Sequence, residues 1–320
     1  MLRLLVVSLS AAALLLPDVR AQQPVVPPLI RIVVPVSAGA INDVVARVVA
    51  PKLAAQLGTS VIVENRAGAN GFIGASAVAK GPTDGSMLLL YSNSMISAGA
   101  TSRNPAIDVV KDLQPVAGLM ELPLVVAAST KSGIKTPAEL LAAARTKPDG
   151  LTHSNGGVGG VAHIISELMA EAGKFRLTNV TYRGGAPAVM DLGAGVVDLS
   201  ISTHSALGAL AKSGRVQLVA VTSKEPSRNN PNLPAMASVL PGFVHNLWIG
   251  VWTTPGTPPA LVQRYNRELL EIARSKEVQD LVAVEEGSPL SWTPEQFGAQ
   301  IRGSYDQFKR IAADRQIVLE

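Results

Sequence analysis

The sequence has 320 residues, of which 28 are lysine or arginine and 24 are aspartate or glutamate, so its formal net charge is +4. Because the basic residues are scattered singly and aromatic residues make up only 4% of the chain, the composition supports neither a nucleic-acid groove nor a basic membrane anchor. The chain contains no cysteine, which removes disulfides, thiolate catalysis and cysteine-ligated metal from consideration.

The first 21 residues have the pattern of a secretory signal. An arginine precedes an apolar run from Leu4 to Leu16, and Val19 and Ala21 are placed like the small residues of a cleavage site. This run is shorter than the roughly 20 residues that a membrane-spanning helix needs. We therefore expect export and cleavage near Ala21, with residues 1–21 as the signal peptide. The remaining chain is long enough for two domains.

Short apolar runs rich in β-branched residues recur along the chain and indicate strands. Their near-continuous apolarity predicts burial on both faces, which is typical of parallel sheets with helices on either side. The sequence therefore predicts an α/β fold. The predicted strands are 29–34, 60–65, 86–91, 122–128, 179–182, 197–201, 216–221 and 247–252.

Threonine-proline pairs mark the starts of several predicted helices. TPAE at 136–139 and TPEQ at 293–296 both fit a capping box with proline in the first helical position. Thr257-Pro258 repeats this start without the acidic partner. A further helix is expected from Asp43, with a kink or break at Pro51.

The stretch HSNGGVGGVAHIISELM, residues 153–169, places a glycine cluster directly before a helical pattern that begins at Ala162. Glycine is favoured where the backbone adopts unusual dihedrals or where another group approaches closely. Free N–H groups and the positive end of the helix dipole make such a helix start a good anion site. A tight turn that binds nothing explains the same pattern equally well.

The loops that follow the predicted strands are dominated by small and amide residues. In an open parallel sheet, ligands bind beyond the carboxyl ends of the strands, so these loops are the expected place for a binding site. Such a surface offers hydrogen bonds and space but few acids or bases. The loops are SAGAIND, NRAGANG, SNSMIS, SNGGVGG, RGGAP and STHSA.

No reaction centre can be recognised in the sequence. The segment 157–162 formally fits the dinucleotide pattern G-x-G-x-x-G/A, but no acid that could hold a ribose lies between Lys174 and Tyr182. There is no G-x-S-x-G elbow for serine hydrolysis. The histidines show no zinc-binding spacing, and His163 is better explained as a packing or capping residue than as a base. These absences predict that the protein is not an enzyme and needs no cofactor or metal.

Two charged residues near the glycine-rich loops, Asp43 and Arg183, can each be explained either as a ligand contact or as a structural residue. Asp43, in the first turn of its helix, is stabilised by the helix dipole by about 0.3–1 kcal/mol whether or not it binds anything. Arg183 lies next to Gly184 and Gly185, where it could pair with a bound carboxylate or with a surface acid.

Taken together, these motifs resemble the Bug-type receptors, the extracytoplasmic solute-binding proteins of tripartite tricarboxylate transporters. RIVVPVSAGAINDVVARVV and VIVENRAGANGFIGA are similar to the family's opening strand, PGG-x-x-D loop, helix and VVENRPGAGGNIGA block. HSNGGVGGVAH is similar to its S-x-G-x-G-[ST]-x-x-H segment, and VTYRGGAPAVMDLGAGVVDL to its VPYKG-x-x-PA-x-x-D block. TTPGTP resembles the family's APAGTP. The resemblance runs from about Ile30 to the C-terminus.

This resemblance implies a type II periplasmic-binding-protein fold, in which two lobes, each with a mostly parallel central sheet, enclose a ligand cleft. We expect residues 22–124 and 226–320 to form one lobe and residues 125–225 the other, with the proline-rich segment 225–242 crossing between them. The implied function is capture of a small carboxylate in the periplasm and its delivery to a membrane permease. An orphan receptor that feeds a sensor protein remains open.

The expected ligand-binding residues come from the family motifs and from the loops after the strands. The sequence departs from the family pattern at three places: Ala38-Gly39-Ala40 stands where the family has PGG, Asn155 where it has a serine, and Gly160 where it has a serine or threonine. The expected residues are Ser37, Ala38, Gly39, Asn42, Asp43, Asn93, Ser94, Asn155, Gly157, Gly159, Gly160, Arg183, Gly184, Asp191 and Thr203.

Two rival classes share parts of this pattern. A transcription-factor effector domain has the same lobe architecture but needs a helix-turn-helix ahead of it, where this chain carries the signal pattern. An exported enzyme would be indicated by turnover that depends on Asp43 or His163.

Overall fold

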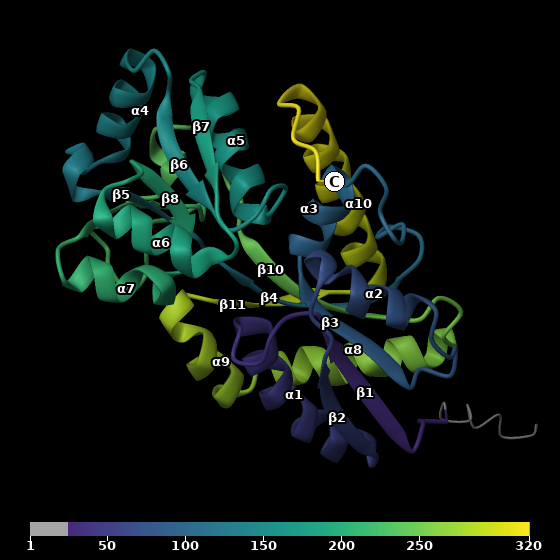
Figure 1. Ribbon diagram of the computed structural model, residues 1–320. Helices are drawn as coiled ribbons and strands as arrows, with labels where there is room; N and C mark the ends of the chain where they lie inside the picture. The colour runs from purple at the N-terminus through teal and green to yellow at the C-terminus, as the bar shows by residue number, and fades with distance from the viewer. Residues whose placement is uncertain (1–24, 320) are drawn as a thin grey trace, which may run out of the picture.

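The computed structural model describes residues 25–319, which form two α/β lobes (Figure 1). The predicted signal peptide, residues 1–21, lies outside the described residues. Within the described part of the chain, no helix is both long and apolar enough to cross a membrane.

The first lobe is built on a six-stranded mixed sheet in the order β11-β4-β10-β3-β1-β2. β1 pairs in parallel with β2 and β3, whereas β10 runs antiparallel to both β3 and β4, and β11 antiparallel to β4. Most of its strands therefore run in one direction. Their bounds are β1 Leu29–Val34, β2 Ser60–Asn65, β3 Met87–Ser92, β4 Gln114–Leu122, β10 Leu247–Thr253 and β11 Ser288–Trp292.

Six helices belong to this sheet. They are α1 Ile41–Leu57, α2 Phe72–Ala79, α3 Ser94–Thr101, α8 Pro259–Ala273, α9 Lys276–Val282 and α10 Pro294–Asp314. α1 continues through Pro51 without the predicted break, because the helix on either side packs buried residues such as Val49 and Leu53 into the core.

The second lobe is built on a five-stranded mixed sheet in the order β7-β6-β8-β5-β9. β6 pairs in parallel with β7 and β8, and β5 runs antiparallel to β8 and β9. The strands are β5 Val125–Ser129, β6 Leu151–Asn155, β7 Leu177–Thr181, β8 Leu199–Ser202 and β9 Val216–Val221. The helices are α4 Pro137–Thr146, α5 Val161–Gly173, α6 Gly185–Ala194 and α7 His204–Lys212.

The chain crosses between the lobes twice. It passes from β4 to β5 through Pro123 and Leu124, and it returns between β9 and β10 through the segment 222–246, which contains the proline-rich run. The lobe boundaries 22–124, 125–225 and 226–320 stay a prediction. The short 3₁₀ turns are η1 Ala69–Gly71, η2 Thr130–Ser132, η3 Met236–Ser238 and η4 Ala283–Glu285.

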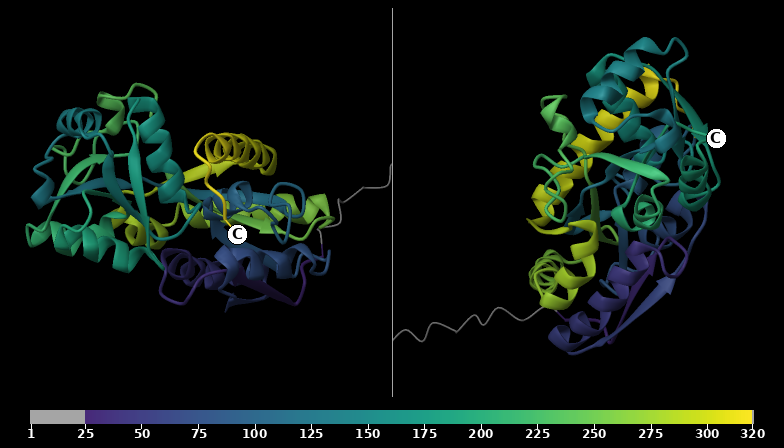
Figure 2. Two further views of the ribbon diagram at one scale, coloured as in Figure 1. Left: turned by 45° about the horizontal axis from the view of Figure 1, so that its top comes forward. Right: turned by 90° about the vertical axis from the view of Figure 1, so that its left-hand side faces the viewer.

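The two lobes also touch through their helices. α10 packs along α3 and reaches α5 of the second lobe, as two views show (Figures 1 and 2). Arg310 of α10 forms a two-point ion pair with Glu171 of α5 at 2.7 and 2.8 Å. One apolar core runs from the first sheet into the α5 side of the second lobe, while a separate cluster lies under α6 and α7. α5 is therefore in direct contact with the first lobe.

The predicted strand 122–128 is wrong, because that run holds parts of two strands in different sheets. β4 ends at Leu122 and β5 begins at Val125, with Pro123, which has no N–H to donate to a ladder, between them. β6, β11 and the first part of β4 were not predicted as strands. The other predicted strands are present with small shifts at their ends.

Candidate functional site

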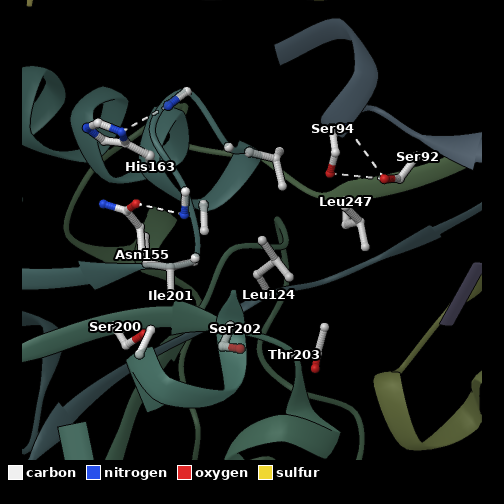
Figure 3. A pocket seen from close by; sticks show the side chains of 18 of the residues that line it. Ser92, Ser94, Leu124, Asn155, His163, Ser200, Ile201, Ser202, Thr203 and Leu247 are labelled. Atoms are coloured by element: carbon white, nitrogen blue, oxygen red, sulfur yellow. Dashed lines mark hydrogen bonds between the residues drawn. The ribbon is translucent and has the colours of Figure 1, made fainter. Parts of the chain in front are cut away.

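A cavity of about 350 Å³ lies between the two lobes. Its walls come from the loops and helix starts that follow β1, β2 and β3 in the first lobe and β6, β7 and β8 in the second. Leu124 and Leu247, which flank the two crossings, contribute apolar surface (Figure 3). This is the position expected for a ligand site at the carboxyl ends of strands in α/β sheets.

Five helices begin at this cavity. The first turns of α1, α3, α5 and α6 contribute Ile41, Ser94, Val161 and Gly185 to its lining, and the N-cap of α7 contributes Thr203. Because each helix start carries a partial positive charge, five of them gathered at one cavity make it attractive to an anion.

Four of these five helix starts have no side-chain cap on the N-cap residue. At α3 the first N–H, that of Ser94, donates to the hydroxyl of Ser92 at 3.4 Å, which leaves three helix starts with free backbone donors. The N-caps of α1, α5 and α6 are Ala40, Gly160 and Gly184, and none of them has a side-chain cap. The first N–H groups of α5, those of Val161 and Ala162, find no acceptor within residues 25–319. The first N–H groups of a helix have no partner within the helix, so at these half-exposed positions beside the cavity they are available to a bound acceptor.

Two asparagines in the lining have buried polar atoms without a hydrogen-bond partner in the described residues. These atoms are Oδ1 of Asn42 and Nδ2 of Asn155. The Oδ1 atom of Asn155 accepts the N–H of Gly157 at 3.1 Å, which fixes the amide so that Nδ2 remains available (Figure 3). Asn155 thus adds a side-chain donor where the family pattern has a serine.

The cavity carries no formal charge. Its lining contains no aspartate, glutamate, lysine or arginine. Burial lowers the pKa of His163 to about 4, and its Nδ1 accepts the N–H of Gly159 at 3.3 Å, so the ring is neutral with its proton on Nε2. Burial raises the pKa of Tyr91 to about 12, which keeps its hydroxyl protonated. Backbone dipoles and neutral hydrogen-bonding groups therefore dominate the electrostatics.

The glycines of the segment 156–160 have different roles. A Cβ on Gly156 would lie 2.8 Å from the backbone nitrogen of Gly185, so this glycine lets two loops pack together. A Cβ on Gly157 would meet open space. At Gly159, φ is +69° and a Cβ would lie 2.1 Å from Oγ1 of Thr101, so this glycine makes room for the first lobe rather than for a ligand.

The carboxylate of Asp43 is fully engaged within its own lobe. It accepts hydrogen bonds from the Gly39 N–H at 2.8 Å, from Nδ2 of Asn65 at 2.8 Å and from Nε of Arg47 at 3.0 Å. Asp43 is 2% exposed and is absent from the cavity lining. It therefore orders the loop SAGAIND at the start of α1.

About half of the expected site residues line the cavity. They are Asn42, Ser94, Asn155, Gly157, Gly159, Gly160 and Thr203. Those outside the lining are Ser37, Ala38, Gly39, Asp43, Asn93, Arg183, Gly184 and Asp191. As ligand contacts, all of them stay predictions.

Several residues outside the lining have other partners. Asp191 accepts the hydroxyl of Tyr182 at 2.7 Å, and Asn93 donates to the carbonyl of Asn246 at 3.1 Å beside the second crossing. Arg183 and the loop 37–39 are exposed.

The sequence reasoning missed several lining residues. Ser92 and Ser202 lie at the ends of β3 and β8, within or next to loops that were already singled out, so their position was a usable signal. Ser154 is the first residue of the loop SNGGVGG, which was also singled out, whereas Ser200 lies inside β8, where strand alternation alone does not reveal which face meets the cavity. Within residues 25–319, no group of three or more histidines or acids could hold a metal ion.

Two α/β lobes joined by two crossings, with an uncharged cavity of mixed polar and apolar lining between them, define the class of periplasmic binding proteins. The model of the tripartite tricarboxylate transporter family receptor matches residues 45–315. The chain therefore belongs to this family, whose members are solute-binding receptors and not enzymes. The resemblance and the fold predicted from the motifs are confirmed.

Individual relatives agree with this assignment. The chain is 35% identical over 270 residues to Protein BugT of Bordetella pertussis, covering 83% of each chain. It superimposes on R. palustris Rpa4515 with adipate with a TM-score of 0.78 at 26% identity, covering 91% of this chain and 98% of the other. For MatC from Rhodopseudomonas palustris with bound malate, the TM-score is 0.74 at 25% identity, with 88% and 98% covered.

Proposed function

We propose that the protein captures a small organic acid in the cleft between its lobes and delivers it to a membrane transporter. The single observation that carries this proposal is the set of helix starts with open N–H donors around a cavity without charged side chains. A neutral guest would leave these donors poorly matched, whereas carboxylate oxygens accept two or more hydrogen bonds each.

Hydrogen bonds from such donors are strong enough to hold a carboxylate without an arginine side chain in the cavity. A hydrogen bond to a charged group contributes about 1.5–3 kcal/mol, so three or four converging donors suffice for micromolar binding, which needs about 8 kcal/mol. The cavity of about 350 Å³ lies near the lower end of ligand pockets, roughly 300–1,000 Å³, which favours a small metabolite. Two structural relatives were solved with the dicarboxylates adipate and malate, which supports this class of guest.

A thermal-shift screen tests the proposal. The panel contains mono-, di- and tricarboxylates, amino acids and nicotinate-like acids, and each carboxylate is matched by its neutral amide. Because a ligand that binds only the folded state stabilises it by RT ln(1 + [L]/Kd), about 2.7 kcal/mol at 100 times Kd, at least one acid should raise Tm clearly while its amide does not. No shift with any acid, or equal shifts with acid and amide, would contradict the proposal.

The family places the partner in a tripartite transporter, and we infer that the receptor hands its ligand to the permease subunits rather than to a sensor protein. Deleting the gene should abolish uptake of the labelled ligand by intact cells. Unchanged uptake together with a lost transcriptional response would favour the sensor.

Export with cleavage near Ala21 is tested by sequencing the N-terminus of the mature protein, which should start near Gln22.

A further inference from the structure

The glycine segment of the second lobe touches α3 of the first lobe through a buried hydrogen bond. The hydroxyl of Ser97, in the middle of α3, donates to the carbonyl of Gly159. Ser97 is 0% exposed, and neither it nor Gly159 belongs to a crossing between the lobes. The contact therefore forms only when α3 and the start of α5 come together.

The backbone of Gly159 fits tightly against α3. Thr101, one turn after Ser97, places its Oγ1 atom where a side chain on Gly159 would start, at 2.1 Å from the ideal Cβ position. This hydroxyl is itself fixed, because it donates to the carbonyl of Ser97 at 2.9 Å. A side chain at position 159 would therefore require Thr101 or the start of α5 to shift.

Gly159 is also close in sequence to the backbone N–H groups that face the cavity. Its N–H donates to Nδ1 of His163 at 3.3 Å, and the chain then continues through Gly160 into the open donors of Val161 and Ala162. The Gly159 carbonyl is thus held from the first lobe while its N–H is held from α5. These two hydrogen bonds, on the successive peptide groups on either side of Gly159, connect the start of α5 to the first lobe.

Neither Ser97 nor Thr101 lines the cavity. We propose that the Ser97 hydroxyl is a positioning group that fastens the glycine segment to α3 in the closed receptor, so that ligand affinity depends on a residue that does not touch the ligand. This inference rests on the proposed function for its affinity readout, but the lobe contact itself can be measured without any ligand.

The first test compares Ser97→Ala with Ser304→Ala. Ser304 is also a buried serine of the first lobe, but its hydroxyl accepts a hydrogen bond from Gln300 of its own helix at 3.3 Å instead of bonding across the lobes. Since one lost hydrogen bond weakens closure, Ser97→Ala should raise the dissociation rate of the bound carboxylate roughly tenfold and leave the association rate within about twofold. Ser304→Ala should change neither rate. Equal rates for Ser97→Ala and the wild type would overturn the proposal.

The second test measures the separation of the lobes. The chain has no cysteine, so Ile73→Cys on α2 and Met190→Cys on α6, both at exposed positions, allow one spin label per lobe. In Ser97→Ala, the distribution of label distances should shift toward longer values, with or without ligand. If no carboxylate binds the wild type, the proposed function fails, yet this ligand-free comparison still decides the role of Ser97. Identical distributions in all conditions would refute it.

A double substitution tests whether the two residues act through one contact. Gly159→Ala places a Cβ against Thr101 and should raise the dissociation rate by more than Ser97→Ala does. Because the hydrogen bond is then already broken, adding Ser97→Ala should have almost no further effect. Multiplicative effects of the two substitutions would show that Ser97 acts elsewhere.

Discussion

Asp43 shows how a single buried carboxylate organises the loop at the entrance to α1. Burial disfavours its ionisation, but hydrogen bonds from Arg47, Gly39 and Asn65 outweigh this and hold the pKa of Asp43 below its ordinary value. A lowered pKa means that the folded state favours the ionised form. The resulting stabilisation is therefore present above the unfolded pKa of about 3.9 and is lost as the pH falls through the folded pKa.

Replacing this carboxylate should be costly. Asp43→Ala leaves the Gly39 N–H without its acceptor and removes one of the two acceptors of the Asn65 amide, which keeps the Val36 carbonyl at 3.1 Å. We therefore expect the free energy of unfolding at pH 7 to fall by about 1–3 kcal/mol. Urea denaturation measures this, with Asp280→Ala, an exposed acid, as the control. The difference from wild type should shrink as the pH drops below 4. A difference under about 0.5 kcal/mol at pH 7 would contradict this role.

At this scale, the sequence left two readings for each important residue. Asp43 was compatible with a helix-start acid or a ligand contact, and Gly159 with a ligand approach or a plain turn. The structure gives each residue partners that are distant in sequence, Asn65 for Asp43 and Thr101 for Gly159. Local patterns do not contain such partners, which is why they could not decide between the readings.

Among the elements, helix starts were predicted well because their signals are local. Thr136 and Thr293 are the N-caps of α4 and α10, and their hydroxyls accept the N–H of Glu139 and Gln296. Only the second forms the complete capping box. At the third predicted start, α8 begins at Pro259, and the hydroxyl of Thr257 donates to the carbonyl of Thr254 instead of capping the helix.

The N-cap of α10 allows a prediction of how much one helix start contributes to the stability of the protein. Thr293→Ala should lower the free energy of unfolding by about 1 kcal/mol, because the first turn of α10 loses the acceptor for the Gln296 N–H. Thr293→Ser keeps the hydroxyl and should retain most of the stability. Equal loss in both variants, measured by urea denaturation, would show that the methyl group and not the cap matters.

Strands were harder to predict because their partners lie far away. β6 has the polar sequence LTHSN, yet His153, Ser154 and Asn155 are all buried, and the last two line the cavity. The start of β4 contains Gly118, which pairs with Gly250 and makes room for the ring of Trp292. Glycine weakens a strand pattern, and the compensating ring comes from β11, far along the chain.

For the whole molecule, the two-lobed plan came from the family resemblance and not from strand patterns alone. Apolar runs indicated an α/β fold, but the switch from one sheet to the other at Pro123 is hidden inside a continuous apolar run. The lobe boundaries 22–124, 125–225 and 226–320 follow from that plan and stay a prediction. From the sequence, the binding site could be predicted only as a set of loops, because the depth of the cavity between them depends on how the two lobes are arranged.

An uncharged cavity makes binding insensitive to pH near neutrality. The lining groups with shifted pKa values titrate outside this range, His163 at about 4 and Tyr91 at about 12. We therefore expect the Kd for a fully ionised carboxylate to change less than about twofold between pH 6 and pH 8, as measured by isothermal titration calorimetry. A tenfold loss of affinity over this range would indicate a protonated histidine in the site.

The central claim is that backbone amides at converging helix starts hold the anion. A crystal structure of the receptor with the strongest carboxylate from the thermal-shift screen tests it most directly. We expect carboxylate oxygens within hydrogen-bond distance of the Val161 and Ala162 N–H groups, with first-turn donors of α1 or α6 close by. A carboxylate held instead by a lysine or arginine side chain, or bound outside the cleft between the lobes, would contradict the claim.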